Sequence, residues 1–128
     1  AAETETDRIE LYTEEFAKQF ALGNKQAIKP YTECAILANK LGLGINAGHD
    51  LSLQNIKFFK ENVPNLLEVS IGHALICEAL YDGLENVISE YLRNRKKGLN
   101  IEHSVMHLLY ERRPYLPTAE KFLCFIFV

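Results

Sequence analysis

The sequence predicts an α/β fold with a parallel sheet, and three observations lead to that class. Strand-like and helix-like segments alternate three times along the chain, the strand-like runs are short, and glycines stand at their boundaries. This alternation is typical of parallel β/α architecture, in which a helix follows each strand and returns the chain to the same edge of the sheet.

The first β/α unit begins with a strand over Arg8–Thr13, where apolar and polar side chains alternate. Thr13 is the predicted N-cap of the following helix. Glu14 and Glu15 support that start, because carboxylates suit the positive end of a helix. The helical pattern ends at Gly23.

The second unit contains a predicted amphipathic helix over Lys25–Leu41, with Pro30 close enough to its start to be tolerated. This helix is expected to end at Gly42. A short apolar run, Leu43–Asn46, is bounded by glycines and is typical of a buried strand in a parallel sheet. Residues 47–50 follow as a predicted loop.

The next helix is capped in this prediction by Asp50 or Ser52 and continues through Phe59. Residues 62–64, with their proline, end it.

A third strand is predicted over Leu66–Ile71. Gly72 and His73 then turn the chain directly into one long helix that reaches Leu92, because its apolar residues recur at helical spacing.

Chain length limits what these three units can be. The chain has 128 residues, whereas a complete (β/α)8 barrel needs about 250. We therefore expect residues 1–97 to be part of such a barrel. Residues 98–128, where the alternation stops, are an unassigned tail that could derive from a neighbouring reading frame, a fusion or a divergent extension.

Composition excludes several classes of partner. The net charge of −3 gives no general electrostatic reason to bind nucleic acid, and the basic run at residues 93–97 is predicted to be a solvated helix end. No apolar run approaches the ~18 residues that a membrane span needs. Cys34 and Cys77 are predicted to be buried free thiols, and with Cys124 they show no metal-like spacing, as expected of a cytoplasmic protein.

Candidate functional residues lie at the strand ends, where parallel α/β folds bind their ligands. His49 could act as a general acid or base near neutral pH, although a structural role is equally open. Gly72 and His73 begin a helix whose free N–H groups suit a phosphate, and the alternative is a glycine chosen for a tight turn. Glu10 faces away from the apolar side chains of its strand and is predicted to face a barrel interior, and the alternative is a solvent-facing residue of an antiparallel sheet.

Two further possibilities concern the same residues. A metal site built from His49, His73 and Glu10 is disfavoured, because their spacing matches no metal signature. Asn46 could orient His49 or bind substrate, or it could only satisfy backbone groups.

Four segments together carry a resemblance to a known family: Ile9–Thr13, Gly44–Leu51, Asn55–Lys57 and Leu67–Ile76. They resemble the last three β/α units of pyridoxine 5'-phosphate synthase, over about residues 1–93. The specific feature is the pair Asn-Ala-Gly-His and Ile-Gly-His-Ala at this separation.

The resemblance implies a TIM barrel that condenses 3-amino-2-oxopropyl phosphate with 1-deoxy-D-xylulose 5-phosphate, giving pyridoxine 5'-phosphate, phosphate and water. It implies no cofactor and no metal, only small phosphorylated substrates, and a homo-oligomer in the complete protein. By resemblance, His49 is the proton donor in ring formation and Glu10 stabilises a transition state. Asp50, Gly72 and His73 match positions that bind the amino-oxopropyl phosphate, and since some members have glycine in place of Asp50, a backbone contact is expected there.

The other half of the family's barrel carries further substrate contacts and catalytic groups, so we expect this chain not to catalyse the reaction alone. A non-catalytic phosphate-binding module that serves in assembly is the main alternative. Another phosphate-handling barrel, such as an aldolase-like enzyme, would need a Schiff-base lysine at a strand end, and no lysine stands there.

Overall fold

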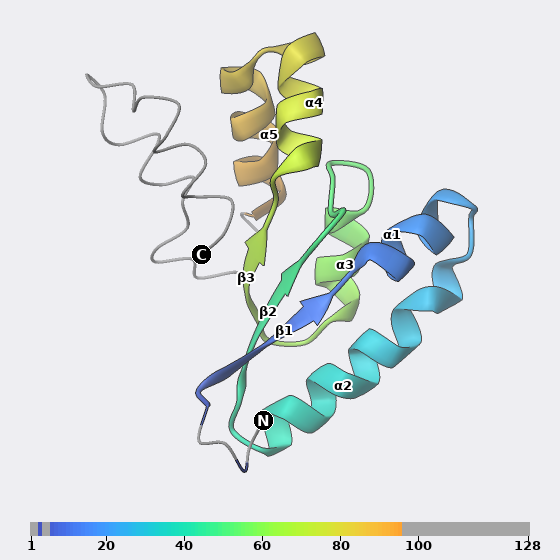
Figure 1. The fold of residues 1–128 in the computed structure, drawn as a ribbon, viewed down its shortest axis with the longest axis vertical. Coiled ribbons are helices and arrows are strands. Elements are labelled where there is room, and N and C mark those ends of the chain that lie inside the picture. Colours follow the sequence, from blue (N-terminus) through green and yellow to red (C-terminus); the bar gives the residue numbers. More distant parts are fainter. Residues whose placement is uncertain (1–2, 4–5, 96–128) are drawn as a thin grey trace.

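A computed structural model of the chain describes residue 3 and residues 6–95. Strands and helices alternate in it as β/α units (Figure 1). The elements are β1 (Arg8–Tyr12), α1 (Glu14–Ala21), the 3₁₀ helix η2 (Lys25–Ile28), α2 (Lys29–Lys40), β2 (Gly44–Gly48), α3 (Ile56–Asn62), β3 (Leu66–Ser70), α4 (His73–Asp82) and α5 (Leu84–Arg95).

The three strands form one parallel sheet in the order β1-β2-β3. The pairing of β2 with β3 slips at one point, because Ile45 lies opposite Leu66 whereas Asn46 lies opposite Glu68. Leu67 is therefore an extra residue in β3, as in a β-bulge. Since all strands run the same way, their carboxyl ends meet at one edge of the sheet, where the candidate residues stand.

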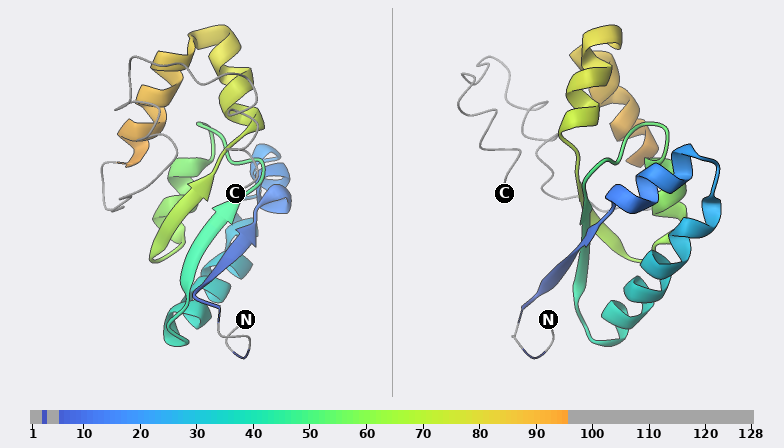
Figure 2. Two further views of the ribbon diagram at one scale, coloured as in Figure 1. Left: turned by 60° about the vertical axis from the view of Figure 1, so that its left-hand side comes forward. Right: turned by 45° about the vertical axis from the view of Figure 1, so that its right-hand side comes forward.

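Helices α1, α2 and α3 lie on one side of the sheet (Figure 2). The main core fills this layer, where Ile45 and Ala47 of β2 pack with Phe16 of α1 and Phe59 of α3. The rings of Phe16 and Phe59 have their centroids 5.0 Å apart. This apolar layer fixes which face of each strand is buried, and so which face is left for polar side chains.

Helices α4 and α5 form a second layer beyond the carboxyl end of β3 (Figure 1). They pack together around a smaller core that contains Leu75, Val87 and Tyr91 and joins Ile56 at the start of α3. None of the described helices is long and apolar enough to cross a bilayer.

The predicted alternation and the parallel sheet are confirmed, with small changes at the boundaries. Strand β2 runs from Gly44 to Gly48, so Ala47 and Gly48 belong to the strand and not to the loop that follows. The reason is pairing on both sides, since Gly48 lies opposite Tyr12 of β1 and Ser70 of β3.

The single long helix predicted after His73 is wrong. The chain forms two helices, α4 and α5, that are separated at Gly83. Gly83 has φ of 81° and ψ of 140°, a combination outside the helical region that glycine, having no Cβ, adopts without strain.

The prediction of buried thiols is also wrong, because both Cys34 and Cys77 are exposed. In α2 the buried positions are Ala35 and Ala38, and Cys34 lies outside that stripe. Cys124, the tail and the end of the basic run lie outside the described residues.

Candidate active site

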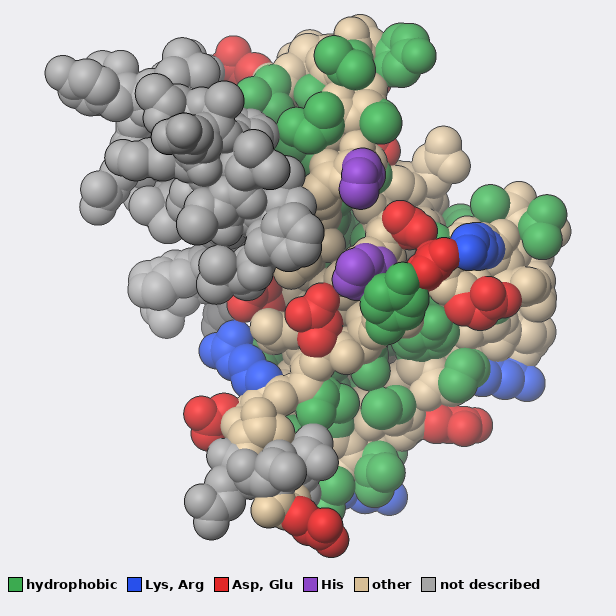
Figure 3. All heavy atoms as spheres, in the orientation of Figure 1, with side chains coloured by type: hydrophobic (Ala, Val, Ile, Leu, Met, Phe, Trp, Pro, Cys, Tyr) green, Lys and Arg blue, Asp and Glu red, His purple; other side chains and the backbone are tan. Residues whose placement is uncertain are grey.

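The two histidine turns lie at the same edge of the sheet. His49 directly follows β2, and Gly72 and His73 follow β3, the neighbouring parallel strand. Figure 3 shows two histidine side chains on one face of the molecule, with acidic side chains beside them. Residues that are 24 positions apart in the sequence are thus brought to one rim by the parallel pairing.

A row of polar side chains crosses the sheet below this rim. Glu10, Asn46 and Glu68 occupy paired positions on β1, β2 and β3. Glu10 is exposed whereas Leu11 is buried, so the two faces of β1 are divided as the alternation predicts. Among the described residues no helix packs against this second face, and a carboxylate, an amide and a second carboxylate lie across it in line.

Contacts within the row involve Glu68, which the sequence did not single out. Its Oε2 accepts a hydrogen bond from Asn46 Nδ2 at 3.5 Å and pairs with Arg8 Nη1 at 3.3 Å. The Arg8 side chain is 54% exposed, so this ion pair contributes little to stability. Glu68 follows an extra residue in β3, and only the irregular register places it opposite Asn46.

The other end of the Asn46 amide is unusual. Its Oδ1 is buried and has no hydrogen-bond partner among the described residues. A buried acceptor without a donor costs about 1–3 kcal/mol. A ligand O–H or N–H group would satisfy this oxygen, which makes the middle of the row a chemically suitable place for a polar substrate.

Gly48 allows Glu10 to lie over β2. A Cβ added to Gly48 would collide with Glu10 Oε1 and would also approach Ser70 Cβ at 3.4 Å. Because Gly48 has no side chain, the Glu10 carboxylate has room to lie close to the end of β2, which leads into His49.

The His49 turn has an uncommon backbone. His49 has φ of 76° and Asp50 has φ of 58°, both in the left-handed region that favours glycine. The ring of Tyr12 packs against the imidazole, with centroids 4.3 Å apart and planes at 46°. Non-glycine residues keep such a conformation only when their surroundings hold it, and strained turns of this kind are common at functional sites.

Tyr12 is held in turn by the start of α1. Its hydroxyl donates a hydrogen bond to Glu14, which also pairs with Lys18. The bond to Glu14 raises the pKa of Tyr12, and the Lys18 ammonium lowers the pKa of Glu14. The Tyr12 ring beside the imidazole therefore stays uncharged.

Thr13 does not have the predicted capping role. It stands at the N-cap position of α1, but its side chain makes no capping bond. Its hydroxyl instead donates to the carbonyl of Gly48 at 2.6 Å, with the carbonyl of His49 also within reach. The side chain is fully buried, and buried carbonyls need donors more than the exposed first turn of a helix does.

The predicted caps Asp50 and Ser52 are wrong as well, because Asn55 occupies the N-cap position of α3 and makes no capping bond. Asn55 is 5% exposed and closes the loop instead. It accepts from Ser52 N–H at 2.9 Å and donates to the Asp50 carbonyl at 3.1 Å. Helical periodicity carries no signal for such a loop contact, so the sequence pattern does not predict this role of Asn55.

The last part of the rim is the start of α4. Gly72 stands at its N-cap position without a side-chain cap, and exposed His73 is its first residue. The first N–H groups of an α-helix have no partner within the helix and carry the positive end of its dipole. This ten-residue helix thus offers anion-binding groups next to the His49 turn.

Comparison with known proteins identifies the family. Residues 1–97 match the family described as "Pyridoxal phosphate biosynthesis protein PdxJ". The chain belongs to this family. Its resemblance to pyridoxine 5'-phosphate synthases, inferred from sequence motifs, is confirmed.

The chain is similar to several proteins that carry the name pyridoxine 5'-phosphate synthase. The protein of Flavobacterium johnsoniae is 70% identical over 96 residues, which are 75% of this chain and 40% of that protein. That of Christiangramia forsetii is 71% identical over 93 residues, 73% of this chain and 39% of the relative. The Cytophaga hutchinsonii protein is 60% identical over 97 residues, 76% of this chain and 41% of the relative. The chain thus spans about two fifths of the length of the curated relatives that it matches.

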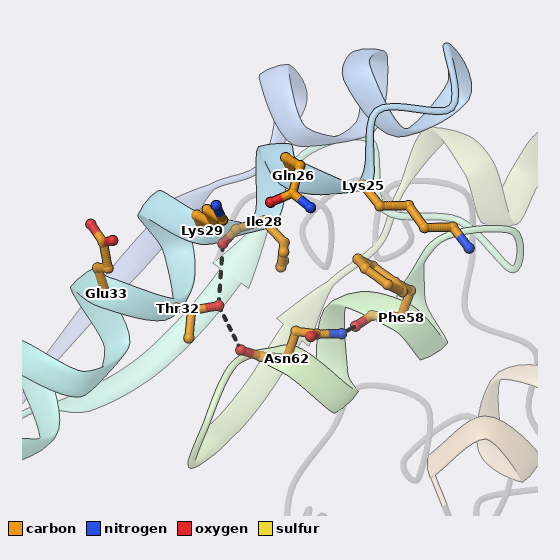
Figure 4. Close-up of a pocket in the computed structure, with 8 residues that line it drawn as sticks. All are labelled: Lys25, Gln26, Ile28, Lys29, Thr32, Glu33, Phe58 and Asn62. Carbon is orange, nitrogen blue, oxygen red and sulfur yellow. Dashed lines mark hydrogen bonds between the residues drawn. The ribbon is translucent and has the colours of Figure 1, made fainter.

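A separate hollow of about 490 Å³ lies on the helix-covered side of this PdxJ-family chain (Figure 4). Thr32 closes part of it by donating to the carbonyls of Ile28 and Asn62. It is lined by Lys25, Gln26, Ile28, Lys29, Thr32, Glu33, Phe58 and Asn62. None of the residues at the strand ends takes part, so the hollow is not the candidate site.

Within the described part of the chain, no group of three or more His, Cys, Asp or Glu side chains is placed to hold a metal ion. The candidate active site of this family member is formed by the His49 turn, the start of α4 and the polar row across the sheet.

Proposed function

We propose that residues 1–97 supply the last three β/α units of a (β/α)8 barrel of pyridoxine 5'-phosphate synthase, with residues 98–128 outside the barrel. One observation carries this proposal: parallel pairing brings the His49 turn and the start of α4 to one rim, with Glu10 on the same sheet. Barrel enzymes assemble their active sites at this end of the strands.

The proposed reaction joins 3-amino-2-oxopropyl phosphate to 1-deoxy-D-xylulose 5-phosphate and yields pyridoxine 5'-phosphate, phosphate and water. In this proposal, His49 donates a proton during ring formation and Glu10 stabilises the charge that develops opposite it. Elimination of water needs a proton donor held close to the leaving oxygen, and an exposed imidazole at a strand end suits that task near neutral pH.

Asp50, Gly72 and His73 would bind the amino-oxopropyl phosphate. The free N–H groups at the start of α4 favour a phosphate dianion, and the exposed His73 can add a side-chain donor. For Asp50 a backbone contact is favoured, because its carboxylate would repel the phosphate. No cofactor or metal is needed for these steps.

We further propose that the 128-residue chain has no synthase activity alone and that the complete enzyme is a homo-oligomer. Coverage supports the first of these, because the matched relatives are about two and a half times longer than the matched segment, whereas the oligomer rests on the family resemblance alone. The chain alone could still bind phosphate as a non-catalytic module, which is the second candidate function.

A grafted synthase tests the proposal. In it, the 96 residues of this chain that match the Flavobacterium johnsoniae protein replace the corresponding segment of that protein. We expect pyridoxine 5'-phosphate formation by the graft and none by the isolated chain. His49→Asn should lower kcat by about 100-fold or more, the usual contribution of a general acid.

The matched control is Lys29→Ala, which changes an exposed residue of the helix-side hollow and should leave kcat unchanged. A graft that forms no product, or whose His49→Asn variant keeps full activity, would contradict the proposed function. Phosphate binding by the isolated chain together with an unaffected His49→Asn graft would favour the non-catalytic module.

A further inference from the structure

The hydroxyl of Thr13 contacts both peptide groups that flank the Cα of His49. It donates to the Gly48 carbonyl, which belongs to the peptide before His49, and it reaches the His49 carbonyl, which belongs to the peptide after it. The Thr13 backbone N–H adds a third contact, to the Gly48 carbonyl at 2.8 Å. The relative orientation of two successive peptide planes is what φ and ψ describe, so these contacts bear directly on the backbone of His49.

That backbone needs such support. His49 and the next residue both have positive φ, which side chains with a Cβ rarely adopt. Without a fixed partner on each side, the turn would relax toward a common conformation and the imidazole would swing away from the rim. Thr13 is fully buried, so its hydroxyl is shielded from water and bonds to protein groups instead.

We propose that Thr13 is a positioning residue for His49, holding the left-handed turn that presents the imidazole to substrate. Tyr12 completes the arrangement, since its ring packs against one side of the imidazole. The end of β1 thus fixes both the backbone and the ring of His49 from the neighbouring strand. This inference rests on the proposed function of His49 as proton donor.

Two substitutions in the grafted synthase separate the hydroxyl from the shape of the side chain. Thr13→Val keeps the volume and removes the donor, and it should lower kcat at least about tenfold while KM for both substrates stays within about threefold, because a misplaced catalytic group costs rate more than binding. Thr13→Ser keeps the donor and should retain kcat within about threefold of the parent. If Thr13→Val is insoluble, Thr13→Ala takes its place with the same expected result.

A double-mutant cycle with His49→Asn shows whether Thr13 acts through His49. In the His49→Asn background, Thr13→Val should cause less than about a twofold further loss of kcat, since there is no longer an imidazole to position. Val63→Ala, which truncates a buried side chain at the end of α3, is the control for lost stability and should leave kcat unchanged at a similar decrease in Tm.

Three outcomes would overturn the inference: full kcat in Thr13→Val, an equal loss in Thr13→Ser, or undiminished loss in the His49→Asn background. Failure of the proposed function is distinct, because it would be seen as full activity of His49→Asn itself or as an inactive graft.

Discussion

At the scale of single residues, the site depends on one small side chain as much as on its charged ones. Gly48 has no Cβ, and the Glu10 carboxylate occupies the space that a Cβ would take. The φ of Gly48 is not in the left-handed region, so the backbone would accept alanine here. The unfavourable contact of an alanine would be the one with Glu10.

Gly48→Ala is therefore expected to displace Glu10 and to lower kcat of the grafted synthase about tenfold, since electrostatic stabilisation depends on placement. Steady-state kinetics of the variant measure the effect. Gly44→Ala is the control on the same strand, because its new Cβ would meet the flexible side chains of Leu67 and Arg8 and should cost less than about threefold. Equal losses in the two variants would contradict this role of Gly48.

Residue types at the site were partly predictable from the sequence. His49 and Glu10 follow from simple local rules, because one stands after a strand and the other alternates with buried residues. The contacts of Thr13 join residues 35 and 36 positions apart, and no local pattern encodes them. A local rule predicted a helix cap at Thr13, and tertiary contact with the β2 end prevailed.

At the scale of elements, the α4–α5 pair is tied to the loop before α3. One oxygen of Glu78 accepts from the Leu53 N–H at 3.1 Å, and the other accepts from the Tyr91 hydroxyl at 2.6 Å. Tyr91 is 6% exposed. The hydrogen bond therefore joins α5 to α4 in a buried setting and supports the helix whose start lies at the rim.

Tyr91→Phe removes that hydrogen bond and should lower the free energy of unfolding of the grafted synthase by about 1 kcal/mol at neutral pH. Urea unfolding followed by circular dichroism measures the change. Tyr81→Phe is the matched control, because Tyr81 is 90% exposed and should have no effect. A Tyr91→Phe variant as stable as the control would show that the bond contributes nothing.

The hydrogen bond between Tyr91 and Glu78 also predicts that the stability of the fold depends on pH. Burial, with the hydrogen bond to Glu78, raises the pKa of Tyr91 above its ordinary value of 10.0. Above about pH 10 the unfolded chain loses a proton that the folded chain retains, so stability falls as pH rises through that range. Tyr91→Phe should show a shallower alkaline loss than the parent, and an unchanged slope would contradict the assignment.

The sequence predicts whether each element is a strand or a helix. It predicts the ends of an element less well where pairing with other strands sets them. Strands and helices followed from periodicity, yet β2 gained two residues because both neighbouring strands pair with its end. Gly83 itself is a signal for the end of a helix. Apolar residues continue at helical spacing on both sides of it, however, and this spacing favoured a single helix in the prediction.

At the scale of the whole molecule, the described core lies almost entirely on the helix side of the sheet. The opposite face carries the row of Glu10, Asn46 and Glu68, and within the described chain β1 and β3 each leave one edge unpaired. An unpaired strand edge can pair with another chain, and a closed barrel removes such edges. In the proposed barrel, the polar face would line the interior at the end where the candidate site lies.

In the proposed site, the His49 turn and the start of α4 face one phosphorylated substrate. A crystal structure of the grafted synthase soaked with inorganic phosphate tests this arrangement most directly. We expect a phosphate oxygen within about 3 Å of the backbone N–H groups of Gly72 or His73, with the His49 imidazole facing the same phosphate. Phosphate found only elsewhere, or an imidazole turned away from the bound phosphate, would contradict the proposed site.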